Sequence, residues 1–166
     1  MTELPRIETE RLVLRSYRHD DTPALARLLA DPAVRRWWPS PIDEPSLDDE
    51  FAGHWTVLLG DEVIGILEAW EENDPNYPSV AFDIALATEH HGQGMGPEAL
   101  RAAVAHFVEQ GHHRFSIDPN VDNDRAIAAY QKVGFKPIGV ARQAEIQLDG
   151  SRHDSLMMDL LSDEVE

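Results

Sequence analysis

The chain of 166 residues contains no cysteine. It therefore has no disulfide bond, no thiolate nucleophile and no metal site built from cysteine. Positive charge is also scarce, because 14 lysines and arginines face 31 acidic residues and the formal net charge is −17. Lys132 and Lys136 are the two lysines. Duplex nucleic acid is bound through clustered Lys and Arg, so we expect no nucleic-acid partner.

Long apolar runs are missing too, and none approaches the ~20 residues of a membrane span. Residues Met1–Arg6 lack the basic-then-apolar pattern of a signal peptide, so we expect a cytoplasmic protein without membrane contact. The hydrophobic fraction of 42% predicts one globular domain covering residues 1–166. The acidic charge has two interpretations: solubility, or attraction of a cationic substrate.

Hydrophobic periodicity predicts antiparallel strands first and then strand–helix–strand–helix units. Strands are expected at 11–15, 55–59, 63–70, 80–87, 113–117, 135–147 and 152–160. Helices are expected to begin at 20–23, to follow the glycines at 92–96, and to run from 122 or 123 to about 133. This order predicts an α/β domain around one mixed sheet.

The segment His91-Gly92-Gln93-Gly94-Met95-Gly96 lies between a predicted strand and a predicted helix. Glycines at such a turn leave backbone N–H groups bare, and the helix dipole adds positive charge, so the pattern favours phosphate binding. The spacing differs from the Gly-x-Gly-x-x-Gly of dinucleotide-binding folds, and the Gly-Lys-Ser/Thr of a P-loop is absent. A purely structural turn is the remaining alternative.

A second motif follows about thirty residues later, Asn123-x-x-Ala126-x-x-x-Tyr130-x-x-x-Gly134-Phe135. In this order the two motifs, over roughly residues 80–136, resemble the GNAT acyl-CoA N-acyltransferases. The resemblance implies the GNAT fold, with a single mixed sheet flanked by helices on both faces. It also implies acetyl-CoA as the co-substrate.

In that family the glycine loop binds the pyrophosphate, and the pantetheine arm pairs with the strand before the loop, where small alanines allow close approach. The residues expected at the cofactor are Ala85, Leu86, Ala87, His91, Gly92, Gln93, Gly94, Met95, Gly96, Asn123 and Ala126. His91 stands where the family usually has Gln or Arg, and we expect it to add one hydrogen bond. His90 and His91 are interpreted as an exposed pair, and no metal site is expected.

Asp83 and Tyr130 are the expected catalytic residues. A carboxylate at Asp83 shares a strand face with alanines and is costly without a partner. It is either paired with an arginine or it accepts the substrate amine, as general base or as anchor. In the family the phenol at the position of Tyr130 protonates the departing thiolate; the alternative for Tyr130 is core packing.

A narrower resemblance, to the aminoglycoside 6′-N-acetyltransferases, rests on three features. Asp83 matches an Asp of that group, Asp118-Pro119 matches the segment that holds a ring ammonium, and Trp37-Trp38 matches a wall of the substrate site. Asp118 in an Asx turn is the alternative for the second feature. Core packing is the alternative to ligand stacking for the tryptophans.

These features predict an N-acetyltransferase that acetylates a primary amine of a cationic small molecule, an aminoglycoside or related amino sugar. A protein N-terminus, a polyamine or a siderophore-type amine is the alternative acceptor. A non-catalytic acyl-CoA-binding sensor is the alternative of another class, and Asp83 together with Tyr130 argues against it. Either a monomer or a homodimer is expected.

Overall fold

The computed structural model describes residues 3–39 and 44–166. The strands are β1 (Ile7–Glu8), β2 (Leu12–Ser16), β3 (Trp55–Leu59), β4 (Glu62–Glu72), β5 (Ser79–Leu86), β6 (Arg114–Ile117), β7 (Lys136–Ile146) and β8 (Arg152–Leu161). The α-helices are α1 (Thr22–Ala30), α2 (Pro32–Arg35), α3 (Glu44–Phe51), α4 (Met95–Glu109) and α5 (Asp124–Val133). Short 3₁₀ helices are η1 (His19–Asp21), η2 (Thr88–His90) and η3 (Ser162–Glu164).

The strands form one mixed eight-stranded sheet in the order β1-β2-β3-β4-β5-β6-β8-β7. The chain divides into two compact units. The first comprises the residues up to Glu68 together with Ile84–Ala99, and the second comprises Ala69–Asp83 and Leu100–Glu166. Strands β4 and β5 and helix α4 pass from one unit to the other along the chain.

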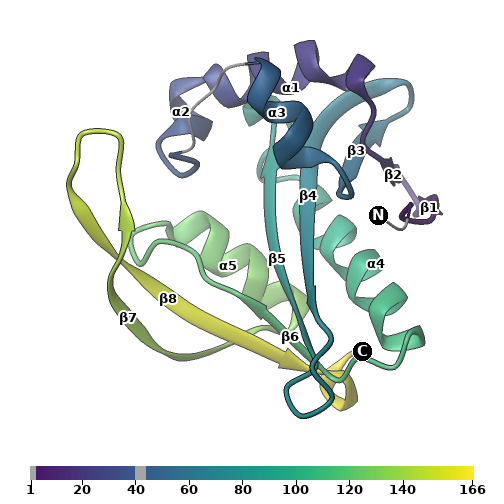
Figure 1. Cartoon of the computed structure of the whole chain (residues 1–166), viewed down its shortest axis with the longest axis vertical. Coiled ribbons are helices and arrows are strands. Elements are labelled where there is room, and N and C mark those ends of the chain that lie inside the picture. Colours follow the sequence, from purple (N-terminus) through teal and green to yellow (C-terminus); the bar gives the residue numbers. More distant parts are fainter. Residues whose placement is uncertain (1–2, 40–43) are drawn as a thin grey trace. The chain divides into compact units, whose positions relative to one another are not determined.

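In the first unit, β1 to β4 pair in antiparallel order. Helices α1, α2 and α3 lie beside one another (Figure 1). Their apolar side chains form a cluster with two residues of the sheet. Its buried members are Leu25, Leu28, Leu29, Val34, Trp38, Leu47, Phe51, Ile66 and Ala85. This cluster is the core of the unit, because burying apolar surface is the main favourable contribution to folding.

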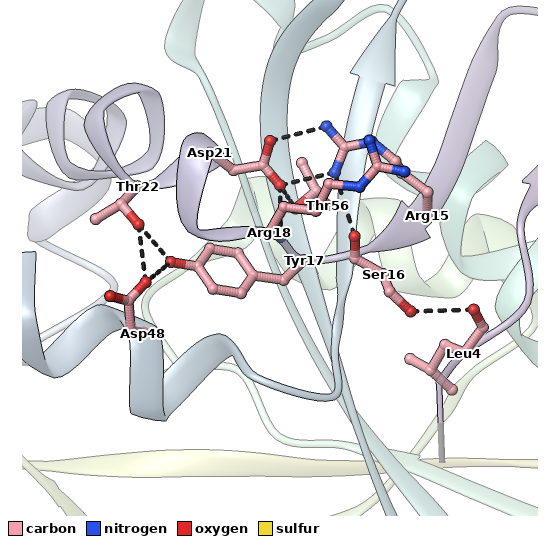
Figure 2. A network of polar contacts seen from close by, with 9 residues as sticks. All are labelled: Leu4, Arg15, Ser16, Tyr17, Arg18, Asp21, Thr22, Asp48 and Thr56. Carbon is pink, nitrogen blue, oxygen red and sulfur yellow. Dashed lines mark hydrogen bonds and ion pairs between the residues drawn. The ribbon is translucent and has the colours of Figure 1, made fainter. Parts of the chain in front are cut away.

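A network of hydrogen bonds and ion pairs connects the helices of this unit to its strands (Figure 2). The Arg15 guanidinium donates to both carboxylate oxygens of Asp21 at 2.7 and 2.8 Å, and the Thr56 hydroxyl donates to the same carboxylate at 2.8 Å. The Tyr17 hydroxyl donates to Asp48 of α3. Burial and the hydrogen bond to Asp48 raise the pKa of Tyr17 to about 12.

The carboxylate of Asp21 makes the unit sensitive to acid. Burial alone would raise the pKa of Asp21, but the hydrogen bonds from Arg15, the Arg18 backbone and Thr56 together hold it below the ordinary value. Because this pKa lies below that of the unfolded chain, ionised Asp21 stabilises the fold above about pH 4. The stabilisation is lost as the pH falls through the folded-state pKa.

We therefore expect Asp21→Asn to lower the free energy of unfolding by about 3 kcal/mol at pH 7, because the half-buried Arg15 loses its charged partner. Urea unfolding of the mutant should also depend less on pH below about pH 5 than that of the wild type. Asp20→Asn, at the exposed neighbouring residue, is the control. Equal destabilisation by the two substitutions would contradict the assignment.

In the second unit, β5 runs parallel to β6, with Val80 opposite Phe115. β6 pairs antiparallel with β8, and β8 pairs with β7 in a long hairpin (Figure 1). Phe82 of β5 packs against Phe107 of α4 and against Phe115, with ring centroids 5.9 and 6.1 Å apart. The alternation of β5 thus buries Phe82 and leaves Asp83 partly exposed.

The predicted α/β architecture around a single mixed sheet is confirmed. The short strand β1 was missed, since two residues are too few to show periodicity. Helix α1 begins where expected, with Asp21 at the N-cap position, but Asp21 makes no side-chain capping bond because its carboxylate is bound to Arg15. No helix among the described residues is long and apolar enough to cross a membrane.

Candidate active site

The glycine loop joins η2 to α4. Gly92 and Gly94 have φ angles of 73° and 78°, in the left-handed region that glycine adopts without strain. No hydrogen bond connects the backbone N–H groups of residues 92–96 with an acceptor in the described part of the chain. A Cβ built on Gly92 would meet no atom within 4 Å. The loop therefore presents open N–H groups beside a helix N-terminus, as anion sites do.

Arg11 and Glu98 fix the position of the loop, and neither residue was predicted from the sequence. The Arg11 guanidinium donates to the Gln93 carbonyl oxygen at 2.8 Å and to Glu98 in the first turn of α4 at 2.7 Å. Burial would raise the pKa of Glu98, but hydrogen bonds from Thr9 and Arg11 lower it. The carbonyl of the loop is thus directed to a cation within the protein, which fixes the loop before any ligand arrives.

His91 makes a hydrogen bond within the chain, and its contact with a cofactor stays a prediction. Its Nε2 lies 2.7 Å from the Leu86 carbonyl oxygen, so this ring nitrogen ties the loop to the end of β5. The expectation that His90 and His91 form an exposed pair is wrong, because both are partly buried. Gly65 of β4 was also missed: a Cβ there would come within 2.4 Å of the Ala85 carbonyl oxygen. An isolated glycine in a strand pattern is the signal for such close backbone approach.

Burial shows a packing role for two of the residues expected at the ligands. Trp38 is 6% exposed and lies in the cluster of the helical core, so its ring packs there and is not an exposed wall. The methyl group of Ala85 belongs to the same cluster, so the small side chain serves core packing. Trp37 is partly exposed, and the guanidinium of Arg36 lies 4.5 Å from its ring centroid. Contacts of these residues with a ligand remain predictions.

In the second unit, Tyr130 is 6% exposed on α5. Burial raises the pKa of Tyr130 well above its ordinary value, the negative charge of Asp83 raises it further, and Asp118 adds to the effect. Arg125 opposes this shift. No hydrogen bond of the Tyr130 hydroxyl occurs among the described residues. The fold therefore brings a protonated phenol and two carboxylates within electrostatic reach of one another.

Asp118 is joined by a carboxylate that the sequence did not reveal, Glu145 of β7. Partial removal of water by the surrounding chain raises the pKa of Asp118, although this residue is exposed at the surface. Burial also raises the pKa of Glu145, the charge of Asp118 adds to the shift, and a hydrogen bond from Asn120 opposes it. Neither carboxylate forms an ion pair within the part of the chain described. The two residues are 27 positions apart in the sequence, so no local pattern predicted that they lie close together.

Asn123 is the N-cap residue of helix α5, and Ala126 lies in its first turn. The Asn123 side chain accepts a hydrogen bond from the Ala126 N–H at 3.2 Å and thereby caps the helix. Gly134 ends the helix in the left-handed conformation with φ 119°. The motif thus encodes the two ends of the helix that carries Tyr130, while the contact of Asn123 with a cofactor remains a prediction.

The loop fits the pyrophosphate of a nucleotide-linked thioester such as acetyl-CoA. Its N–H groups are open, a side chain at Gly92 or Gly94 would require a strained backbone, and Arg11 is engaged with Gln93 and Glu98. A strand, a glycine loop and a helix in this order, in a mixed sheet, fit the class of the acyl-CoA acyltransferases. Residues 11–136 match the family described as Acetyltransferase (GNAT) domain. The chain belongs to this family, whose members use acetyl-CoA.

Curated relatives are similar to parts of the chain. A mycothiol acetyltransferase of Corynebacterium efficiens is 33% identical over 76 residues, which cover 46% of this chain and 25% of that protein. A ribosomal-protein-serine acetyltransferase of Escherichia coli is 29% identical over 100 residues, which cover 60% of this chain and 55% of that protein. The chain thus spans about a quarter and about half of the length of these relatives.

Solved structures share the fold over nearly the whole chain. A ribosomal L7/L12 α-N-protein acetyltransferase in complex with coenzyme A is 24% identical, with a TM-score of 0.84 over 96% of this chain and 99% of that one. Spermidine N-acetyltransferase from Vibrio cholerae, in complex with CoA and spermine, is 21% identical, with a TM-score of 0.80 over 94% and 98%. The names of these relatives do not include an aminoglycoside acetyltransferase.

Proposed function

We propose that the protein transfers the acetyl group of acetyl-CoA to a primary amine. The observation that carries this proposal is the row of open backbone N–H groups from Gly92 to Gly96, held in place by Arg11. Membership of the GNAT family supports it. When bound, acetyl-CoA supplies the activated acyl group as a thioester.

Different residues of the chain bind the cofactor and transfer the protons. Gly92–Gly96 bind the pyrophosphate through the backbone, and the backbone of Ala85, Leu86 and Ala87 pairs with the pantetheine arm. Asp83 accepts a proton from the amine or anchors it, and Tyr130 donates a proton to the departing thiolate. The phenol of Tyr130 is protonated at neutral pH, as that of an ordinary tyrosine is, so it has a proton to donate.

The acceptor is a cationic amine, and an aminoglycoside or related amino sugar is the first candidate. Asp83 and Asp118 act together on Tyr130, and Glu145 adds a third carboxylate beside Asp118. A bound ammonium would offset the repulsion among these groups and return the pKa of Asp118 toward its ordinary value. The second candidate is a protein N-terminal amine, which the names of the ribosomal-protein acetyltransferases favour.

Steady-state release of thiol from acetyl-CoA, measured with aminoglycosides, spermidine and a peptide amine, separates these acceptors. We expect Asp118→Asn to raise KM for the cationic amine by about 10–100-fold, because a charged hydrogen bond is lost. Acetyl-CoA affinity should be unchanged. Asp122→Asn, which removes an exposed charge from the same segment, is the matched control.

Three outcomes would change the assignment. If only the peptide is acetylated, the protein N-terminus replaces the small amine. If Asp118→Asn and Asp122→Asn have the same effect, Asp118 contributes general charge and no specific contact. If acetyl-CoA binds but no amine releases thiol, the chain is an acyl-CoA-binding sensor.

Because the net charge is −17, kcat/KM for a polycationic amine should also fall as salt rises.

A further inference from the structure

Three metal-ligating side chains of the first unit meet beside the glycine loop. Glu62 is the first residue of β4, whereas Glu89 and His90 belong to η2, which directly precedes the loop. One ligand atom of each side chain lies within 4.8 Å of the ligand atoms of the other two. The sequence gives no hint of this cluster, because Glu62 is 27 residues before Glu89.

The ring of His90 is the unusual member of the cluster. Its Nε2 is buried and has no hydrogen-bond partner among the described residues. The side chain is 13% exposed, and Nε2 lies 3.9 Å from the nearer carboxylate oxygen of Glu62. That distance is too long for a hydrogen bond. A buried nitrogen without a partner is rare, so this one calls for an explanation.

A bound metal ion explains both the distance and the unpaired nitrogen. An ion with metal–nitrogen and metal–oxygen bonds of about 2.0–2.2 Å in tetrahedral geometry holds its two ligand atoms about 3.4 Å apart. The Glu62 oxygen and His90 Nε2 would approach each other by about 0.5 Å to reach this geometry, and the ligand atom of Glu89 lies within 4.8 Å of the ligand atoms of the other two. The Glu62 side chain is 62% exposed and free to make this movement.

We propose that Glu62, Glu89 and His90 bind one divalent metal ion of the zinc type. Imidazole nitrogen suits Zn²⁺, Ni²⁺ and Co²⁺ better than Mg²⁺, which takes oxygen ligands in octahedral geometry. The two carboxylates balance the charge of the ion, and water completes the coordination. The ion would tie the start of β4 to η2 and so brace the segment that leads into the glycine loop.

The test is a calorimetric titration of the metal-free full chain with ZnCl₂. We expect one saturable site per chain, and Mg²⁺ at the same concentrations should not compete. His90→Ala and Glu62→Gln should each lower the Zn²⁺ affinity at least about 10-fold, because each removes a ligand. His113→Ala, which removes an exposed histidine distant in sequence from the cluster, is the matched control and should bind as the wild type does.

X-ray absorption of the zinc-loaded protein supplies a second measurement, with one imidazole and oxygen ligands expected. Absence of saturable heat from the wild type would overturn the proposal. Equal affinities of wild type and both ligand variants would do the same, since zinc would then sit elsewhere. Glu62→Gln changes an exposed residue, so it tests the site even if His90→Ala does not fold. None of these measurements depends on acetyl transfer.

Discussion

Tyr130→Phe is expected to lower kcat by about 10²–10⁴ and to leave the affinity for acetyl-CoA nearly unchanged. The substitution removes the phenolic hydroxyl, and general-acid help to a leaving group is worth about that factor. Tyr130 is buried, and its ring packs edge-on against Phe135 with centroids 6.5 Å apart, a contact that phenylalanine keeps. The fold should therefore survive, and the loss should be one of chemistry.

The control is Tyr77→Phe, the same chemical change at a tyrosine that is 76% exposed. Pre-steady-state kinetics should first establish that chemistry limits kcat. Because burial and the charge of Asp83 raise the pKa of Tyr130, deprotonation of the phenol should not reduce kcat below about pH 10. A Tyr130→Phe variant with wild-type kcat under these conditions would assign Tyr130 to packing.

Gly94→Val is the second substitution with a large expected effect, the loss of acetyl-CoA binding by a factor of at least about 100. At a φ of 78°, a β-branched residue is strained, and the loop must change conformation to relieve the strain. The Cβ would also lie 3.5 Å from Arg11, which holds the Gln93 carbonyl. The backbone N–H groups would then no longer converge on a phosphate. Calorimetry with acetyl-CoA measures the loss.

Two variants separate strain from ligand contact. Gly150→Val introduces the same strain at a φ of 82° in the β7–β8 turn, and it should leave acetyl-CoA binding intact. Gly96→Ala introduces no backbone strain, and its Cβ would lie 3.8 Å from Leu86, an ordinary contact. Weaker binding by folded Gly96→Ala would therefore report the close approach of the ligand alone. Wild-type affinity in folded Gly94→Val would remove the loop from the cofactor site.

Much of the fold was predictable because its signals are local. Strand β3 has the predicted bounds, Trp55–Leu59, and β4, β5, β7 and β8 lie within two residues of the predicted ends. Asn123 and Gly134 mark the two ends of α5 as expected, since caps are formed by residues at the helix ends themselves. Asp21 is an exception, because its carboxylate is bound to Arg15 of the preceding strand β2 instead of capping the helix end.

The candidate site likewise has features that the sequence predicts and features that only the tertiary structure shows. The glycine loop follows from the sequence, because a positive φ at Gly92 and Gly94 and open N–H groups at a helix start are properties of a few consecutive residues. The burial of Trp38 does not follow from the sequence, because a tryptophan beside prolines fits the wall of a ligand site as well as a hydrophobic core. Its packing among side chains of α1 and α3 is known only from the tertiary structure, and its contact with a ligand stays a prediction.

The sequence by itself therefore determined the order of the longer strands, the glycine loop and the helix that carries Tyr130. The tertiary structure alone decided which distant side chains act on them. It brought Arg11 to the Gln93 carbonyl, Asp118 and Glu145 together, and Glu62 to His90. The physical reason is that periodicity and capping are encoded within one or two turns of chain. Ion pairs and pKa shifts depend on distances that only the packed sheet and helices fix.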